Sequence, residues 1–139
     1  MELVPLADVE LAYVDIERID YQVGGQFYGT LRGTLEGDRL SGSIQLTNLA
    51  TARPDGVNTP TMRGVLTTPG GGQVWVVLDG IATLRQHDLA RVFLTSAQLR
   101  TSEPQYDWVN TVFGVLEGVL DTDTLKAHAR LFECRATLE

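Results

Sequence analysis

The chain has 139 residues, of which 43% are apolar and 21% charged, so its composition predicts one soluble globular domain covering residues 1–139. Its formal net charge of −7 repels phosphate backbones and argues against a nucleic-acid partner. With one cysteine, no signal-like N-terminus and no apolar run of roughly 20 residues, we expect a cytoplasmic protein without disulfides or a membrane partner.

The first half of the chain alternates between apolar and polar residues as half-buried strands do. A strand over residues 8–16 places Val9, Leu11 and Tyr13 on one face and Ile16 on the other. Residues 26–36 and 40–47 then predict a hairpin around a tight Gly-Asp turn. Glycines alternate with apolar residues on one face of this hairpin, which indicates bending or the close approach of another backbone.

The second half continues with strands separated by turn sequences. Residues 48–60 form a polar connection whose Pro-Asp-Gly and Asn-Thr-Pro sequences favour an ordered, turn-rich loop, and residues 82–89 allow a helical turn. The remaining predicted strands cover residues 61–68, 73–81, 91–102, 109–120 and 124–138.

The number and spacing of these strands predict the architecture. About eight strands with short links, and no helix long enough for a βαβ crossover, give an all-β antiparallel sheet. We predict a single up-and-down β-barrel rather than a sandwich, because closure removes the exposed edges. An eight-stranded barrel is either filled by side chains or wide enough for one small ligand.

The chemical groups of the chain are few and scattered. The two histidines lie far apart in sequence, and no HxH, HExxH or CxxC spacing suggests a metal, so we predict no metal site and no cofactor. No nucleophile elbow, phosphate-binding loop or dinucleotide-binding fingerprint is present, and no motif supports a Ser-His-Asp triad.

Two single residues of the last predicted strand have alternative interpretations. His128 shares a strand face with Lys126 and Arg130; this row is either the solvated outside of the barrel or places His128 in a polar cavity as an acid or base. Cys134 is expected to be a small core residue.

The turn over residues 104–110 concentrates large aromatic and amide side chains. Tyr106, Trp108 and Asn110 form either a plug over one end of the barrel or the wall of a ligand pocket, with Trp108 stacking on the ligand and the other two hydrogen-bonding to it. Both roles can hold together.

The Pro-Asp-Gly loop supplies the next candidates. Arg53 is a candidate ligand-binding residue and Asp55 a candidate acid or base. The alternative is a turn in which Asp55 hydrogen-bonds the local backbone.

Three sequence blocks, in this order, carry a resemblance to a known family. They are RGTLEGDRLSGSI (residues 32–44), ARPDG (52–56) and LTSAQLRTSEPQYDWVN (94–110). They resemble DUF3237, also described as the UPF0311 group, in which GTFEGPRLRGEV, RPDG and FRTAPRFETGAPEYAWLN occur in the same order. The resemblance spans residues 25–133 and implies a calycin-like β-barrel, but no established activity. The matching site positions are Arg53, Asp55, Tyr106, Trp108 and Asn110.

One segment departs from the family pattern. Many members carry a GG-x-D-W sequence where residues 45–51 read QLTNLAT, so the resemblance implies a changed or more apolar pocket here.

Three functional hypotheses follow. The first is a binding protein that holds a hydrophobic or aromatic metabolite. The second is a cofactor-free isomerase, cyclase or lyase, with Asp55, Tyr106 or His128 moving a proton. The third is a structural or interaction protein with a filled barrel. Whether the protein is an enzyme stays open at this point.

The strands over residues 74–81 and 109–120 are apolar on both faces. Such strands offer more apolar surface than one small core needs, and we therefore predict a homodimer or larger homo-oligomer.

Overall fold

The computed structural model describes residues 1–138, and this part of the chain contains ten strands and one 3-10 helix. The helix, η1, covers Pro104–Thr111 and lies between β8 and β9. The strands are β1 (Glu2–Asp20), β2 (Gly25–Glu36), β3 (Gly42–Asn48), β4 (Thr51–Ala52), β5 (Asn58–Thr59), β6 (Thr61–Thr67), β7 (Gln73–Leu84), β8 (Arg91–Arg100), β9 (Phe113–Asp121) and β10 (Lys126–Arg135).

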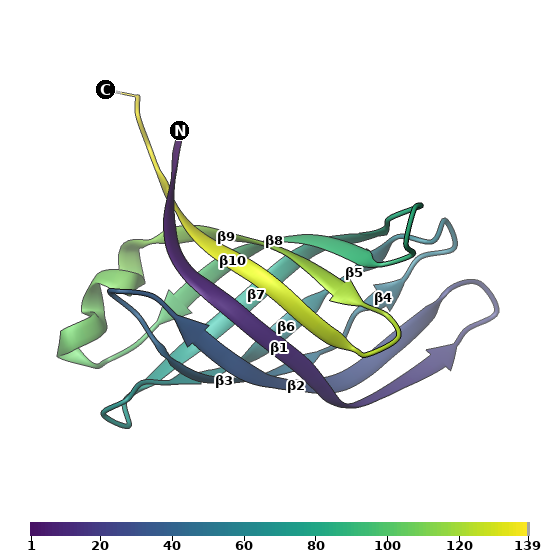
Figure 1. Cartoon of the computed structure of the whole chain (residues 1–139), viewed down its shortest axis with the longest axis horizontal. Coiled ribbons are helices and arrows are strands. Elements are labelled where there is room, and N and C mark those ends of the chain that lie inside the picture. Colours follow the sequence, from purple (N-terminus) through teal and green to yellow (C-terminus); the bar gives the residue numbers. More distant parts are fainter. Residues whose placement is uncertain (139) are drawn as a thin grey trace.

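Eight of these strands close into an antiparallel barrel (Figure 1). β1, β2, β3, β6, β7, β8, β9 and β10 each pair with the next in this order, and β10 pairs back with β1. The short strands β4 and β5 bridge β2 and β7 at one end. The predicted all-β, antiparallel up-and-down barrel of about eight strands is therefore confirmed.

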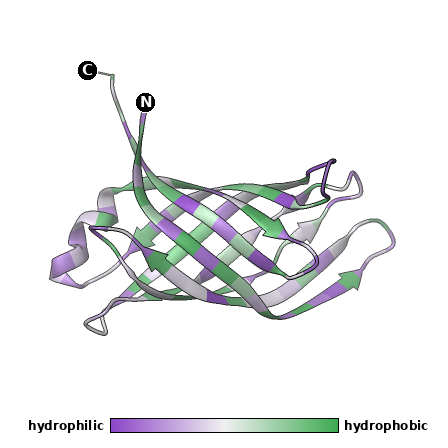
Figure 2. Ribbon diagram, in the orientation of Figure 1, coloured by the Kyte–Doolittle hydropathy of each residue, from purple (hydrophilic) through white to green (hydrophobic). Residues whose placement is uncertain are grey.

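The middle of the barrel is filled by aliphatic side chains. Except at the bulges of β1, residues of the barrel strands alternate between the interior and the outside, and the strands in Figure 2 accordingly alternate between hydrophobic and hydrophilic colours. Leu46, Leu66 and Val74 are completely inaccessible to solvent, and each such burial contributes roughly 1.5–3 kcal/mol. The remaining void at this level is only about 20 Å³. The middle of the barrel is thus filled by side chains.

A β-bulge in β1 changes which side chains face the interior. The pairing of β1 with β2 shifts between Tyr13 and Asp15, leaving Val14 as the extra residue. Ile16 therefore lies on the same side as Leu11 and Tyr13, whereas strict alternation placed it on the opposite face. This extra residue directs an additional apolar side chain into the barrel.

Close backbone contact explains one of the alternating glycines of β2. A methyl group at Gly33 would collide with the carbonyl oxygen of Glu10 on β1. The expectation that a backbone approaches closely is confirmed at this position.

The end of the barrel near η1 is covered. η1 lies at this end of the barrel (Figure 1), and the side chain of its residue Val109 is completely buried. The strand predicted over residues 109–120 is wrong for its first residues, because β9 begins only at Phe113. The amide of Asn110 instead hydrogen-bonds the backbone N–H and carbonyl of Thr101, which holds the segment as a helical turn.

Other boundaries differ by a few residues. Residues 82–84 extend β7, and the helical turn allowed by the sequence is reduced to one hydrogen bond of 2.7 Å from the Leu89 N–H to the Arg85 carbonyl. β10 is shorter than the predicted 124–138. Among residues 1–138, no helix is long and apolar enough to cross a membrane.

Candidate functional site: an apolar cavity at the open end of the barrel

The end opposite η1 contains a cavity of about 300 Å³. This volume is at the lower end of the roughly 300–1,000 Å³ typical of small-molecule sites. The lining residues come from all eight barrel strands, from β5 and from the nearby turns; they are Leu11, Tyr13, Ile16, Phe27, Leu31, Asn48, Ala50, Asn58, Pro60, Met62, Ala82, Arg91, Phe93, Leu120, Thr122, Leu125 and Ala127.

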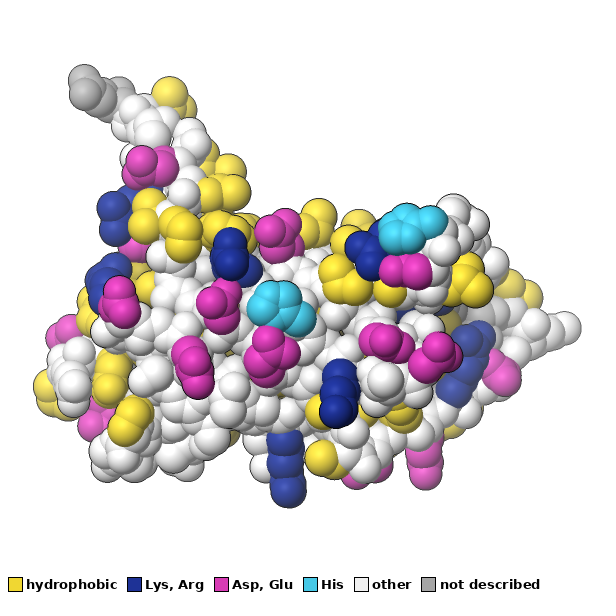
Figure 3. Space-filling view, viewed as in Figure 1, with side chains coloured by type: hydrophobic (Ala, Val, Ile, Leu, Met, Phe, Trp, Pro, Cys, Tyr) yellow, Lys and Arg dark blue, Asp and Glu magenta, His cyan; other side chains and the backbone are white. Residues whose placement is uncertain are grey.

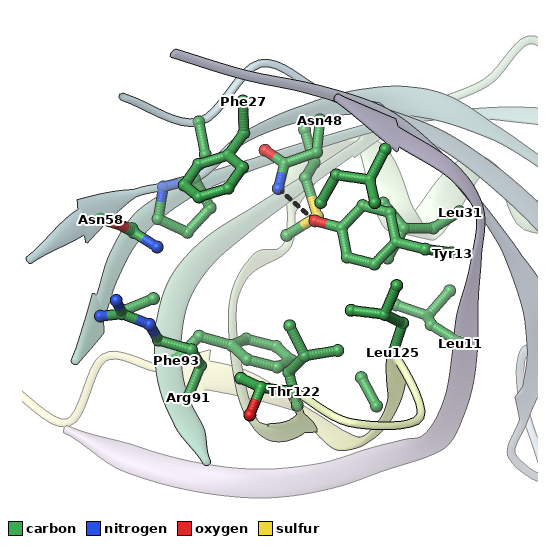
Figure 4. Close-up of a pocket in the computed structure, with 17 residues that line it drawn as sticks. Leu11, Tyr13, Phe27, Leu31, Asn48, Asn58, Arg91, Phe93, Thr122 and Leu125 are labelled. Atoms are coloured by element: carbon green, nitrogen blue, oxygen red, sulfur yellow. Dashed lines mark hydrogen bonds between the residues drawn. The ribbon is translucent and has the colours of Figure 1, made fainter. Parts of the chain in front are cut away.

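The wall is mainly aliphatic and aromatic (Figure 4). Phe27 of β2 and Phe93 of β8 supply the two phenyl rings. The ring of Phe93 lies against β9 because Gly118 has no side chain; a methyl group there would collide with the ring. The cavity is thus shaped to receive apolar surface.

A tyrosine and an asparagine supply the first polar feature. Asn48 Nδ2 donates a 2.8 Å hydrogen bond to the hydroxyl of Tyr13 (Figure 4). Asn48 Oδ1 accepts a 3.2 Å hydrogen bond from the backbone N–H of Thr61, which fixes the orientation of the amide. Asn48 is only 6% exposed, so both bonds compensate its burial.

The arrangement leaves the proton of Tyr13 available. Its hydroxyl accepts from Asn48, and within residues 1–138 no acceptor is found for its own O–H. Burial raises the pKa of the Tyr13 phenol, although the hydrogen bond from Asn48 partly offsets this. The phenol is therefore neutral at physiological pH and can donate one hydrogen bond to an occupant of the cavity.

The second polar feature is an arginine at the rim. Arg91 Nη1 donates a 2.7 Å hydrogen bond to the carbonyl oxygen of Gly56, and Asn58 lies beside it (Figure 4). Partial burial lowers the pKa of Arg91, and the nearby charge of Arg18 lowers it further. A guanidinium nevertheless stays protonated in proteins. Arg91 is the one charged side chain among the described residues that line the cavity.

Arg18 lies close to this rim. Its Nε is 2.7 Å from a carboxylate oxygen of Asp20, and its guanidinium carbon is 5.2 Å from the centre of the Phe27 ring. The charge of Arg18 is therefore paired, whereas Arg91 has no acidic partner within residues 1–138.

Tyr106, Trp108 and Asn110 lie at the other end of the molecule and do not line this cavity. Tyr106 and Trp108 pack on the hydrophobic core, and Asn110 is occupied by the Thr101 backbone. This geometry is that of a plug. A ligand-binding role for the three residues stays a prediction.

Arg53 and Asp55 form an exposed ion pair in the loop between β4 and β5. Arg53 Nη2 lies 2.5 Å from Asp55 Oδ2, and the Val57 N–H donates to Asp55 Oδ1 at 3.1 Å. The hydrogen bond from Arg53, followed by that from Val57, holds the pKa of Asp55 below its ordinary value. Such a carboxylate is a weaker base, and neither residue lines the cavity. Gly56 of the same loop accepts the bond from Arg91.

His128 is exposed on the outer surface of the barrel, and Figure 3 shows acidic side chains distributed over one face of this surface. Its Nδ1 is 2.5 Å from Glu10 Oε1 on β1, and it is flanked by exposed Lys126 and Arg130. This matches the solvated-exterior interpretation. Cys134 is only half-buried, so its prediction as a core residue is wrong.

The polar residues of the cavity were not singled out from the sequence, although a signal exists for two of them. Asn48 continues the alternation of Leu40, Ile44 and Leu46, so it is a polar residue at an apolar position. Arg91 is likewise two residues from Phe93 and lies on the same predicted strand face. Tyr13 shares a predicted strand face with Val9 and Leu11, and nothing in the sequence distinguishes it from a core aromatic. In residues 1–138 no group of three or more His, Cys, Asp and Glu residues could hold a metal ion.

The fold has close structural neighbours at low sequence identity. No protein-family model and no curated protein matches the chain. A β-barrel-like protein from Acinetobacter baumannii AYE superposes with a TM-score of 0.84 at 18% identity, covering 96% of each chain. A conserved protein of unknown function from Rhodopseudomonas palustris gives 0.83 at 16% identity, covering 95% of this chain and 96% of that one.

A third neighbour is described as an enzyme. This protein, from Penicillium herquei, gives a TM-score of 0.72 at 18% identity, covering 95% of this chain and 94% of that one. At such identities the likeness shows a shared barrel fold and nothing finer.

Proposed function

We propose that this protein binds a small hydrophobic or aromatic metabolite in the cavity at the open end of its barrel. The observation that carries the proposal is the cavity of about 300 Å³, with an apolar wall and a few inward polar groups. This is the usual composition of small-molecule sites, in which apolar surface supplies affinity and a few polar groups orient the ligand. The filled middle of the barrel restricts the ligand to this end.

The neutral fluorophore N-phenyl-1-naphthylamine tests the binding proposal, because its emission rises in an apolar site. We expect saturable binding to the wild type. Ala82→Phe should abolish it, since Ala82 lines the cavity and a phenyl ring would fill part of the space. Thr83→Phe is the matched control, because Thr83 is the adjacent exposed residue on β7.

Equal binding by both variants would show that the probe occupies another place and would refute the proposal. Native mass spectrometry of protein purified from its own host complements the probe. A retained mass that Ala82→Phe loses and Thr83→Phe keeps would identify the natural ligand.

A cofactor-free isomerase, cyclase or lyase is the second candidate, and the Tyr13–Asn48 pair favours it. A neutral phenol with a free O–H, oriented by a fixed amide, is suited to protonate or polarise a substrate oxygen. The description of one structural neighbour as an enzyme agrees with this candidate. In this proposal Tyr13 takes the role that the sequence suggested for Asp55, Tyr106 or His128.

Conversion of host metabolites tests the enzyme proposal. Wild-type protein should change the chromatographic retention of one compound in a host extract, without a mass change for an isomerase or cyclase. Tyr13→Phe should lose the conversion, whereas Tyr28→Phe, an exposed tyrosine on β2, should keep it. Conversion that survives Tyr13→Phe would exclude Tyr13 as the proton donor.

We also propose membership of the DUF3237 group, a cytoplasmic location and a homo-oligomeric state. The three ordered sequence blocks support the first, and the barrel fold that the resemblance implied agrees with it.

A further inference from the structure

We propose that the natural occupant of the cavity is an amphipathic carboxylic acid, whose apolar body fills the cavity and whose carboxylate pairs with Arg91. This inference rests on the proposed binding function and names the ligand class.

The charge distribution around the cavity is the first argument. The chain as a whole is acidic, with a net charge of −7, yet none of the described residues that line the cavity is Asp or Glu. Arg91 is the charged member of the lining, and Arg18 lies near enough to influence it. An anion approaching the rim therefore meets positive charge at a point where the rest of the surface offers mainly negative charge.

The unpaired state of Arg91 is the second argument. Nine close contacts between basic and acidic side chains are found among residues 1–138, two of them made by histidines, and Arg91 takes part in none of the nine. Its one hydrogen bond is to the neutral carbonyl oxygen of Gly56. A carbonyl satisfies a donor without neutralising the charge, so a half-buried guanidinium in this position gains from an added anion.

The geometry of the guanidinium is the third argument. Arginine has five N–H donors in a planar fork, which matches the two oxygens of a carboxylate. Within the described part of the chain only one of these donors is used, in the hydrogen bond to Gly56. The amide of Asn58 lies beside the guanidinium and can donate to the same anion (Figure 4).

Matched pairs of ligands isolate the contribution of charge. We would measure displacement of N-phenyl-1-naphthylamine by octanoate and octanamide, and by 3-phenylpropanoate and 3-phenylpropanamide. Each pair has the same apolar body, so the affinity ratio within a pair reports the carboxylate alone. In the wild type we expect the acid to bind about tenfold more tightly than the amide, as for a charge-assisted contact at a partly exposed site.

Variants of Arg91 assign the preference to this side chain. Arg91→Gln should reduce the acid-to-amide ratio to about one, because the acid loses a charge-assisted contact and its affinity falls further than that of the amide. Arg91→Lys should retain part of the preference because it keeps the charge. Arg100→Gln is the matched control, since Arg100 is an exposed arginine at the other end of the same strand. It should leave the ratio unchanged.

The outcomes separate this inference from the proposed function. If acid and amide bound the wild type equally, or if neither displaced the probe, the acid preference would be refuted and the binding function would remain intact. No binding of the fluorophore itself would refute both. Equal losses of acid and amide affinity in Arg91→Gln would show that Arg91 only tethers the Gly56 loop, and would also refute the inference.

Discussion

Arg39 lies across the indole of Trp108, with its guanidinium carbon 3.9 Å from the ring centre. The same guanidinium is 4.0 Å from the carboxylate of Glu133, which is only 8% exposed and is also approached to 3.3 Å by Arg135. These contacts fix the indole to the body of the barrel, at the end away from the cavity.

Trp108→Ala should therefore reduce stability and leave cavity binding unchanged. We expect a loss of about 2 kcal/mol, less than for a fully buried aromatic, because the indole is half-buried. Urea unfolding measures the loss, and the naphthylamine titration measures binding. Trp75→Ala, which removes the exposed tryptophan of β7, should cost much less. A folded Trp108→Ala variant with impaired binding would instead support the prediction that Trp108 forms part of the wall of a ligand pocket.

Asn48→Ala should be costly because two partly buried hydrogen bonds are lost. The N–H of Thr61 loses its acceptor, and the hydroxyl of Tyr13 loses its donor. We expect a decrease of about 2 kcal/mol in the free energy of unfolding. Asn58→Ala is the control, since the Asn58 side chain makes no hydrogen bond within residues 1–138. Similar unfolding midpoints for the two variants would argue against the Tyr13–Asn48–Thr61 connection.

Gly33→Ala should disrupt the pairing of β1 with β2. The new methyl group would meet the carbonyl oxygen of Glu10, which is backbone and cannot rotate away. We expect a loss of about 3 kcal/mol, measured by thermal or urea unfolding. Gly70→Ala provides the contrast, because no atom lies within 4 Å of the corresponding methyl position. Tolerance of both substitutions would be incompatible with this strand register.

The pKa of Tyr13 predicts an alkaline loss of stability. Burial, the larger influence, raises its pKa above the ordinary 10.0, so the folded state retains the neutral phenol. Below pH 10 both folded and unfolded states are protonated, and the contribution is fully present. It is lost as the pH rises from 10 through the folded pKa, because the unfolded phenol ionises first.

Two measurements check this pH dependence. In a near-ultraviolet titration, one of the four tyrosines should ionise late, and Tyr13→Phe should remove this component, whereas Tyr28→Phe should leave it in place. The stability of Tyr13→Phe should also fall less steeply above pH 10 than that of the wild type. If the component that ionises at the highest pH were still present in Tyr13→Phe, the assignment to Tyr13 would be contradicted.

The predicted homo-oligomer can be examined on the outer face of β7 and β8. Ile81 and Leu94 are paired across these strands and are 49% and 60% exposed. If this apolar pair contributes to association, Leu94→Glu should lower the mass found by light scattering at micromolar concentration. Arg100→Glu on the same strand should not. A monomeric wild type would remove the basis for the prediction.

The barrel could be predicted because each of its eight strands shows apolar–polar alternation in its own sequence, and short links join neighbouring strands. Prediction from this alternation failed where a single residue breaks the repeat. The bulge at Val14 reverses the parity of Ile16, and no sequence signal marks it. The side-chain hydrogen bonds of Asn110 end the regular alternation before β9 in a similar way.

The site was harder to predict than the fold because its polar residues come from distant strands. The sequence drew attention to Tyr106 and Trp108, which are conspicuous as large aromatics but pack at the covered end. Tyr13, Asn48 and Arg91 meet only after closure, at separations that no local motif describes. What these residues share is a polar side chain at an inward-facing strand position. Such a residue can be recognised only once it is known which alternate positions of its strand face the interior.

Because the middle of the barrel is filled and its other end is covered, the cavity does not continue through the molecule. A molecule that enters at the cavity end of the barrel has to leave by the same end, because the filled middle prevents passage through the molecule. An elongated occupant has to insert its apolar end first and leaves its other end nearest the solvent. A second protein could bind that end of the occupant while the remainder stays enclosed.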